Sequence, residues 1–288
     1  MAQDQGTKSK PKRRTKSRTK NRHMVYQTLM AVLTVLLILS AAVTLVLLLR
    51  PLYDLGIRIL KLPEKTGISY EVCQRNYRAL IDYNLLFGPK TLVLPDFPVS
   101  KNGLVHFAEV KQMLTGIQIA CWTLLPLVTA LSFLSKRWKA YGWMKAAAFA
   151  VIILSAMVLA ALLIDGNRTL ILFHKIFFRK NEYWIFDPET DPVIQILPPE
   201  IFVMAGIAIL VLMLIGVVIL LVVRSVWMKQ RTRRYKRKTS STGGGKAGTG
   251  NSKSSNRSTA GSNTKSNTKS NTKSSTKSST KSSTGRKK

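Results

Sequence analysis

The residues best suited to acid–base chemistry in this sequence are two histidines, His106 and His174. Each lies beside the end of a different long apolar run, so the two side chains can meet at one end of a helix bundle. An imidazole has an ordinary pKa of about 6.5 and can therefore accept or donate a proton near neutral pH. A pair of imidazoles at the mouth of a bundle suits proton transfer, although either histidine alone is also compatible with a structural role. The third histidine, His23, lies in a basic N-terminal segment.

Glu109 is a candidate partner for the first of these histidines. It follows His106 by three residues, which places both on the same face of a helix. A carboxylate there can orient the imidazole or raise its basicity. The two cysteines, Cys73 and Cys121, lie at different levels of the chain and show no metal-ligand spacing, so we expect neither a disulfide nor a metal site. With only two histidines outside the basic segment, a zinc-dependent hydrolase is disfavoured.

These side chains must be positioned by membrane-spanning helices. About 20 apolar residues cross a bilayer core of about 30 Å. Soluble core helices are shorter and amphipathic, and lipid admits only helices or closed barrels. The sequence therefore predicts an all-α fold, a four-helix transmembrane bundle whose two extracytoplasmic loops contain short helices. The predicted spans are residues 24–49, 113–134, 146–164 and 201–223.

The distribution of charge predicts the orientation of these spans. Residues 1–23 hold 9 Lys/Arg and one acid, and residues 224–288 hold 19 Lys/Arg and no acid. The loop 135–145 is also basic, and loops rich in Lys/Arg stay in the cytosol. Both termini are therefore predicted to be cytosolic, whereas loops 50–112 and 165–200 are predicted to lie at the outer face of the cell membrane.

The two tails, residues 1–23 and 225–288, are predicted to be disordered. The C-terminal tail repeats Lys-Ser-Asn-Thr and Lys-Ser-Ser-Thr and has almost no apolar surface to bury. A basic cytosolic tail can bind anionic lipid head groups, and it can also neutralise nucleic-acid phosphates. It contains no aromatic interleaving and no recognisable nucleic-acid module, so no specific nucleic acid is expected. The plainest interpretation is an anchor that fixes the topology.

Both predicted outer loops carry structure of their own. Residues 69–87 show helical periodicity with Ser69 as N-cap, followed by a strand-like run at 92–94 and a new helix from about Leu104. In the second loop, the apolar residues 171–178 suggest a segment in the membrane interface. The prolines and acid of 198–200 suit the start of the fourth span.

Several of these segments together resemble a known family. They are Leu94–Phe97, residues 100–103 before His106–Lys111, Phe173–Phe178, Trp184–Pro188 and residues 194–200. Their order and their placement between four spans are similar to the lipoprotein intramolecular transacylases (Lit) of Gram-positive bacteria. The resemblance covers roughly residues 24–224, which we treat as the transacylase domain, and excludes both tails.

The resemblance implies an acyltransferase that acts on bacterial lipoproteins with a diacylglyceryl group on their N-terminal cysteine. It implies transfer of the sn-2 acyl chain to the α-amino group of that cysteine, which gives a lyso-form lipoprotein without a cofactor or an acyl-enzyme. His106 and His174 are the expected catalytic pair, with base and acid unassigned. The supporting candidates are Tyr77, Asp96, Glu109, Trp184 and Asp187.

Two other functional classes remain as alternatives. A small transporter would need ionisable residues inside its spans, and these spans are nearly free of charge. A membrane anchor or scaffold that acts through its basic tail would not need the two histidines. Deletion of residues 225–288 separates these classes, because an enzyme would keep its activity.

Overall fold

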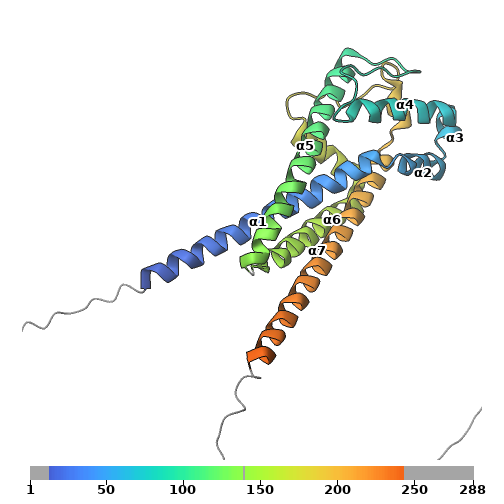
Figure 1. The fold of residues 1–288 in the computed structure, drawn as a ribbon. Coiled ribbons are helices and arrows are strands. Elements are labelled where there is room, and N and C mark those ends of the chain that lie inside the picture. The colour runs from blue at the N-terminus through green and yellow to red at the C-terminus, as the bar shows by residue number, and fades with distance from the viewer. Residues whose placement is uncertain (1–12, 139, 243–288) are drawn as a thin grey trace, which may run out of the picture. The chain divides into compact units, whose positions relative to one another are not determined.

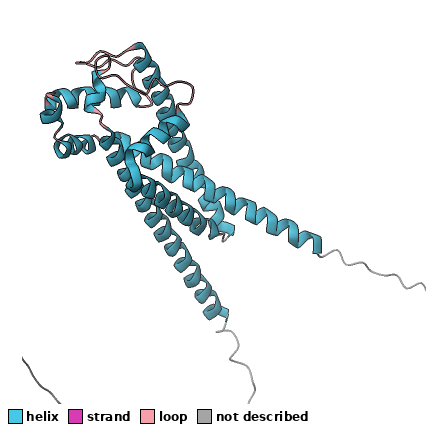
Figure 2. Cartoon of the chain, turned by 180° about the vertical axis from the view of Figure 1, so that it is seen from behind, coloured by secondary structure: helices cyan, strands magenta, loops and turns pink. Residues whose placement is uncertain are grey.

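The computed structural model describes residues 13–138 and 140–242. Within these ranges the chain consists of helices and loops, with no strand (Figure 2). Each of four long helices contains a stretch long and apolar enough to cross a membrane. They are α1 (Arg13–Leu48), α5 (Lys101–Trp138), α6 (Gly142–Phe177) and α7 (Pro199–Thr242). The predicted all-α fold with four membrane-crossing helices is confirmed.

Two buried apolar clusters hold the long helices together. The first joins α1, α6 and α7, and the second joins α1, α5 and α6. Small side chains such as Ala42 and Ala148 in the first cluster let neighbouring helices approach closely. The first cluster contains Ala42, Ala148, Val151, Leu210, Met213 and Val217, and the second contains Met30, Val128, Trp143 and Met144.

Two of the long helices extend further into the basic tails than the sequence predicted. Disorder was expected through residue 23 and from residue 225, whereas α1 begins at Arg13 and α7 ends at Thr242. Once an apolar span has formed its first turns, a helix adds residues cheaply, and Lys and Arg are good helix formers. Residues 1–12 and 243–288, including the Lys/Ser/Thr repeat, lie outside the described residues.

The remaining elements form what we call the cap, residues 49–100 and 178–198. Figure 1 shows the labelled helices of the cap gathered at one end of the long helices. The cap contains α2 (Pro51–Leu60), α3 (Leu62–Thr66), α4 (Tyr70–Asn84) and the short 3-10 helix η1 (Pro192–Ile196). Its core is continuous with α5 and α7, because Phe107 and Ile201 belong to the same buried cluster as Leu80, Val193 and Ile196.

The cap contains the segments predicted to form a helix at residues 69–87 and a strand-like run at residues 92–94. The helix expected at residues 69–87 is α4, and the Ser69 hydroxyl caps it by accepting a hydrogen bond from the Val72 amide at 3.4 Å. The prediction of a strand-like run at residues 92–94 is wrong. Leu92 and Leu94 are buried while Val93 is exposed, but in the described part of the chain this segment is an unpaired loop. The apolar residues Leu92 and Leu94 serve to fill the cap core rather than to form a strand.

Candidate active site

Two imidazoles meet where the long helices join the cap. His106 lies in the second turn of α5 and is only 4% exposed, and His174 lies in the last turn of α6 and is half-buried. Their ring centroids are 5.8 Å apart, with the ring planes inclined at 36°. Two titratable side chains from different helices therefore share one site.

A break in α6 redirects the segment that carries His174. Asp165 has non-helical backbone angles, φ −160° and ψ 97°. Its side-chain Oδ1 accepts a hydrogen bond from the Arg168 amide at 2.9 Å, which restarts the helix in the manner of an N-cap. The part before the break is about 35 Å long, enough for a bilayer core. The sequence-predicted span ends at residue 164, immediately before this break.

Aromatic rings enclose the two imidazoles. Phe178 packs edge-on against His106 with ring centroids 4.8 Å apart, and Phe186 does so at 5.6 Å. Trp184 stacks on His174 at 5.0 Å with an interplanar angle of 29°. These rings fix the imidazole planes and exclude water from their faces.

Hydrogen bonding distinguishes the two histidines. Nδ1 of His174 lies 2.8 Å from the Leu170 carbonyl oxygen. A carbonyl can only accept, so this nitrogen carries the proton and Nε2 of the neutral ring is left as an acceptor. Nδ1 of His106 is buried and has no hydrogen-bond partner in the described ranges. One ring is thus oriented by its own helix, and the other has a buried nitrogen with no partner among the described residues.

Glu109 does not contact the imidazole that the sequence suggested it would orient. Its Oε1 accepts a hydrogen bond from the Asn181 side-chain amide at 3.1 Å. Its Oε2 is buried without a hydrogen-bond partner among the described residues. The carboxylate therefore bridges α5 and the loop after α6, and one of its oxygens remains unused.

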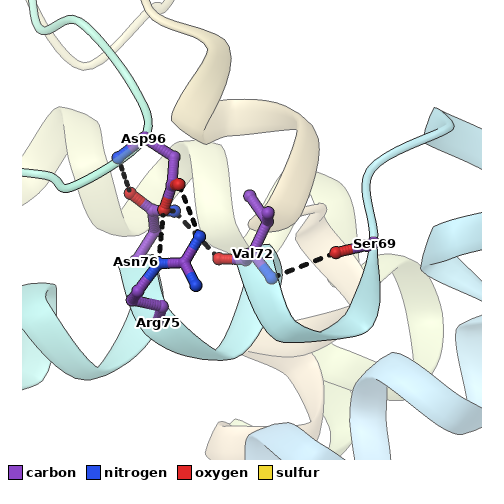
Figure 3. A network of polar contacts seen from close by, with 5 residues as sticks. All are labelled: Ser69, Val72, Arg75, Asn76 and Asp96. Carbon is purple, nitrogen blue, oxygen red and sulfur yellow. Dashed lines mark hydrogen bonds and ion pairs between the residues drawn. The ribbon is translucent and has the colours of Figure 1, made fainter.

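Asp96 lies in a polar network on α4 (Figure 3). Its carboxylate accepts two hydrogen bonds from the Arg75 guanidinium, at 2.6 and 3.0 Å, and one from the Asn76 amide at 2.7 Å. The Asn76 side chain also accepts a hydrogen bond from the Asp96 backbone amide. The Arg75 hydrogen bonds hold the pKa of the Asp96 carboxyl below its ordinary value, with a smaller lowering from Asn76. This network ties the loop before α5 to α4.

Tyr77 and Asp187 also have local roles. The Tyr77 ring stacks on Tyr53 at 3.7 Å, and burial raises the pKa of Tyr77 to about 12, with a further rise from the Asp54 carboxylate. Its phenol is therefore protonated at neutral pH and unsuited to act as a base. Asp187 closes a turn, because its Oδ1 accepts from the Glu189 amide and its carbonyl accepts from the Thr190 and Asp191 amides.

Sequence reasoning missed four residues that build the site. Phe178 and Phe186 contact His106, and Asn181 bonds Glu109. Asp191, only 3% exposed, accepts a hydrogen bond from the Ser100 amide at 2.7 Å, immediately before α5. All four lie between the third and fourth spans. Phe178 and Phe186 fall in the motifs Phe173–Phe178 and Trp184–Pro188, which indicated the family resemblance but did not predict contacts to the histidines.

A groove of about 640 Å³ opens beside the histidine pair. It is lined by residues of α5, by the end of α6 and by the loop that follows, and its exposed lining is more apolar than polar. Phe178 lines the groove and also touches both imidazoles, so it separates the groove from the pair. The lining residues are Glu109, Gln112, Met113, Ile176, Phe177, Phe178, Arg179 and Lys180. In the described part of the chain, no three His, Cys, Asp or Glu side chains are placed to share a metal ion.

Both the sequence and the fold of this chain are similar to those of known proteins. The family model described as lipoprotein intramolecular transacylase Lit matches residues 28–202. The solved structure of the membrane integral lipoprotein intramolecular transacylase Lit from Bacillus cereus is 27% identical, with a TM-score of 0.71 over 74% of this chain and 99% of that chain.

Two variants of the same Bacillus cereus protein match similarly. The variant with one histidine replaced by arginine has 26% identity and a TM-score of 0.69, over 77% of this chain and 99% of that one. The variant with a histidine-to-alanine change has 26% identity and a TM-score of 0.68, over 76% and 99%. The comparison with curated proteins gives no match.

The resemblance that the sequence motifs indicated is therefore confirmed, over a range within the predicted residues 24–224. The family model covers more than half of the chain, and a solved membrane-integral relative shares its fold. The chain belongs to the lipoprotein intramolecular transacylase (Lit) family, and it is a multi-pass membrane acyltransferase that acts on a lipoprotein substrate.

Proposed function

We propose that this enzyme moves the sn-2 acyl chain of a diacylglyceryl lipoprotein to the α-amino group of the lipoprotein's N-terminal cysteine. The product is an N-acylated, S-monoacylglyceryl lipoprotein, the lyso form. The observation that carries this proposal is the pair of imidazoles, 5.8 Å apart, inside a shell of aromatic rings. Family membership supplies the class of reaction and substrate.

The first step of the reaction, deprotonation of the α-ammonium group, requires a base. An α-ammonium group has an ordinary pKa of about 8, so it must lose a proton before its nitrogen can attack an ester carbonyl. Nε2 of His174 is suited to this step, because the bond from Nδ1 to the Leu170 carbonyl leaves Nε2 as an acceptor. The same bond holds the ring in a fixed orientation.

The second step needs a donor and an acid. As the amine nitrogen forms its bond to the carbonyl carbon, negative charge develops on the carbonyl oxygen. The attacking nitrogen gives up a second proton as it becomes an amide. The bond between that carbon and the glycerol oxygen then breaks, and one of the two protons goes to the leaving oxygen while the other is released to water. We assign these oxygens to His106, whose ring lies 5.8 Å from that of His174 and whose buried Nδ1 has no partner among the described residues. One ammonium and one ester thus give one amide, one alcohol and one released proton.

The aromatic enclosure favours acyl transfer over hydrolysis. Donor and acceptor belong to the same substrate, and well-oriented intramolecular reactions reach effective molarities of about 10⁵–10⁸ M. Water at about 55 M is a competitor only if it reaches the carbonyl, and Phe178, Phe186 and Trp184 restrict that access.

The test of these roles is replacement of each histidine by alanine. General acid–base catalysis contributes about 10²–10⁴-fold, so His106→Ala and His174→Ala should each lower the transacylation rate by at least about 100-fold. His23→Ala is the matched control, since His23 is exposed and bonds only Gln27 in the described part of the chain. Full activity in either site variant, with normal membrane insertion, removes that histidine from the mechanism.

We also propose that the cap and its site face the outer side of the membrane, with both termini in the cytosol. The basic loop between α5 and α6 and the basic tails support this orientation. An impermeant maleimide added to intact cells should label Lys90→Cys in the cap and should reach Arg137→Cys only after permeabilisation. The opposite pattern would reverse the topology.

A further inference from the structure

One carboxylate in the site has no part in the proton transfers just described. Glu109 lies one turn after His106 on α5 and lines the groove beside the histidine pair. Asn181 donates to its Oε1 at 3.1 Å, and its Oε2 is buried without a hydrogen-bond partner in the described ranges. Asn181 therefore holds one carboxylate oxygen of Glu109 in place, and the other oxygen can still accept a hydrogen bond.

Glu109 forms no ion pair with another described residue. Arg179 and Lys180 line the same groove, yet neither forms an ion pair with Glu109, and the ion pairs found within residues 13–138 and 140–242 involve other carboxylates. An anionic oxygen removed from water without a counter-charge or a donor is unfavourable. A ligand that brings a cationic N–H group into the groove would remove that penalty.

The groove also lies next to the reacting groups. Phe178 forms part of its wall and contacts both imidazoles, with ring centroids 4.8 Å from His106 and 5.6 Å from His174. Its apolar stretch, Met113 with Ile176 and Phe177, suits hydrocarbon chains. A molecule with a cationic end and an acyl end therefore finds two complementary surfaces in this groove, the free Oε2 of Glu109 and the apolar stretch.

We propose that Glu109 is the positioning residue that binds the α-ammonium group of the substrate's N-terminal cysteine before the amine is deprotonated. This inference rests on the proposed function, which supplies a substrate with an ammonium group at its reacting end. Glu109 pairs with the ammonium through Oε2, while Asn181 keeps the carboxylate oriented. The proton then passes to His174, and the neutral amine leaves Glu109 to attack the ester.

This assignment predicts discrimination between lipoproteins with free and blocked amino termini. Hydrogen bonds to charged groups are strong enough that the pairing should favour the ammonium form about tenfold to a hundredfold in binding. A lipopeptide whose nitrogen is already acylated has no charge to offer and would leave Glu109 unpaired. The enzyme would therefore bind its substrate more tightly than its product.

The test measures binding of two non-reactive lipopeptides to the full chain in nanodiscs. Both carry ether-linked chains in place of esters, and they differ only in a free or an N-acetylated terminus. The wild type should bind the free amine about tenfold to a hundredfold more tightly, and Glu109→Gln should bring the two dissociation constants within about threefold. Glu189→Gln, which removes an exposed acid in the cap, is the matched control and should keep the wild-type ratio.

Each outcome bears on the assignment. A folded Glu109→Gln protein that keeps the wild-type ratio overturns it, as does a wild type that binds both lipopeptides equally. If Glu109→Gln does not fold, Glu109→Met is the second neutral variant, with the same expected loss of the ratio. A parallel assay with the ester-linked lipopeptide separates the two proposals. Absence of wild-type turnover contradicts the proposed function, whereas turnover with an unchanged ratio in the variant contradicts only the role of Glu109.

Discussion

Asp191 offers a sharp test of how the cap positions α5. Its carboxylate is 3% exposed and accepts hydrogen bonds from the Ser100 amide at 2.7 Å and the Thr190 hydroxyl at 3.3 Å. The Ser100 hydroxyl in turn accepts from the Gly103 amide at 2.9 Å, so these bonds fix the first turn of α5. The next turn carries His106.

Asp191→Ala removes a charge-assisted hydrogen bond and leaves a partly buried amide without its partner. The first effect is worth about 1.5–3 kcal/mol and the second about 1–3 kcal/mol, and because they describe the same contact we expect a total of about 3 kcal/mol. Asp191→Asn keeps an oxygen acceptor for the Ser100 amide and should lose only about 1 kcal/mol.

Thermal unfolding of the purified protein in detergent measures this difference. About 1 kcal/mol shifts the midpoint by about 2–4 °C for a chain of this order of size, so the alanine variant should unfold about 6–12 °C below the wild type. The asparagine variant should unfold about 2–4 °C below it. An alanine variant that unfolds at the wild-type temperature would refute the claim that Asp191 fastens the cap to α5.

Three further changes test other parts of the account. Gly103→Ala would place a Cβ 2.7 Å from Oδ1 of Asp191. The overpacking costs about 1–3 kcal/mol, which should outweigh a helix-propensity gain of about 1 kcal/mol, so both the unfolding temperature and the turnover rate should fall. Trp184→Ala removes the ring stacked on His174 and should lower kcat at least about tenfold, whereas Trp184→Phe should keep most of it, as initial rates would show. Asp96→Asn should lower the free energy of unfolding at neutral pH but not at low pH. The pKa of the Asp96 carboxyl is lowered in the folded protein, so the ionised carboxylate stabilises the fold above its unfolded pKa of about 3.9. This stabilisation is lost as the pH falls through the folded pKa. Chemical unfolding at pH 7 and at pH 3 checks this sign, and an unchanged difference at both pH values would contradict it.

The features that sequence reasoning predicted are those encoded locally. An apolar run long enough to cross a bilayer specifies a spanning helix without reference to the rest of the chain. The Ser69 hydroxyl accepts its capping hydrogen bond from the Val72 amide, only three residues away. The end of the third span coincides with the break at Asp165 because a charged residue ends the apolar run there.

Apart from the expected meeting of His106 and His174, contacts between distant segments were beyond that reasoning. Glu109 and Asn181 are separated by 72 positions, so the spacing of Glu109 from His106 suggested a partner that the fold does not provide. The same holds for the rings around the imidazoles, which come from residues after the third span. Short helices were predicted in the outer loops, but the positions of α2 and α3 were not, because segments of 10 and 5 residues carry little periodicity.

The central claim is an acyl transfer from oxygen to nitrogen within one molecule, and mass spectrometry of a lipoprotein's N-terminal peptide tests it most directly. The enzyme would be expressed in cells that make diacylglyceryl lipoproteins and have no N-acylation pathway of their own. The account predicts a peptide of unchanged total mass whose fragments show an acyl amide on the cysteine and a single acyl chain on the glycerol. An unmodified diacylglyceryl peptide, recovered from cells in which the protein is well expressed and membrane-inserted, would contradict it.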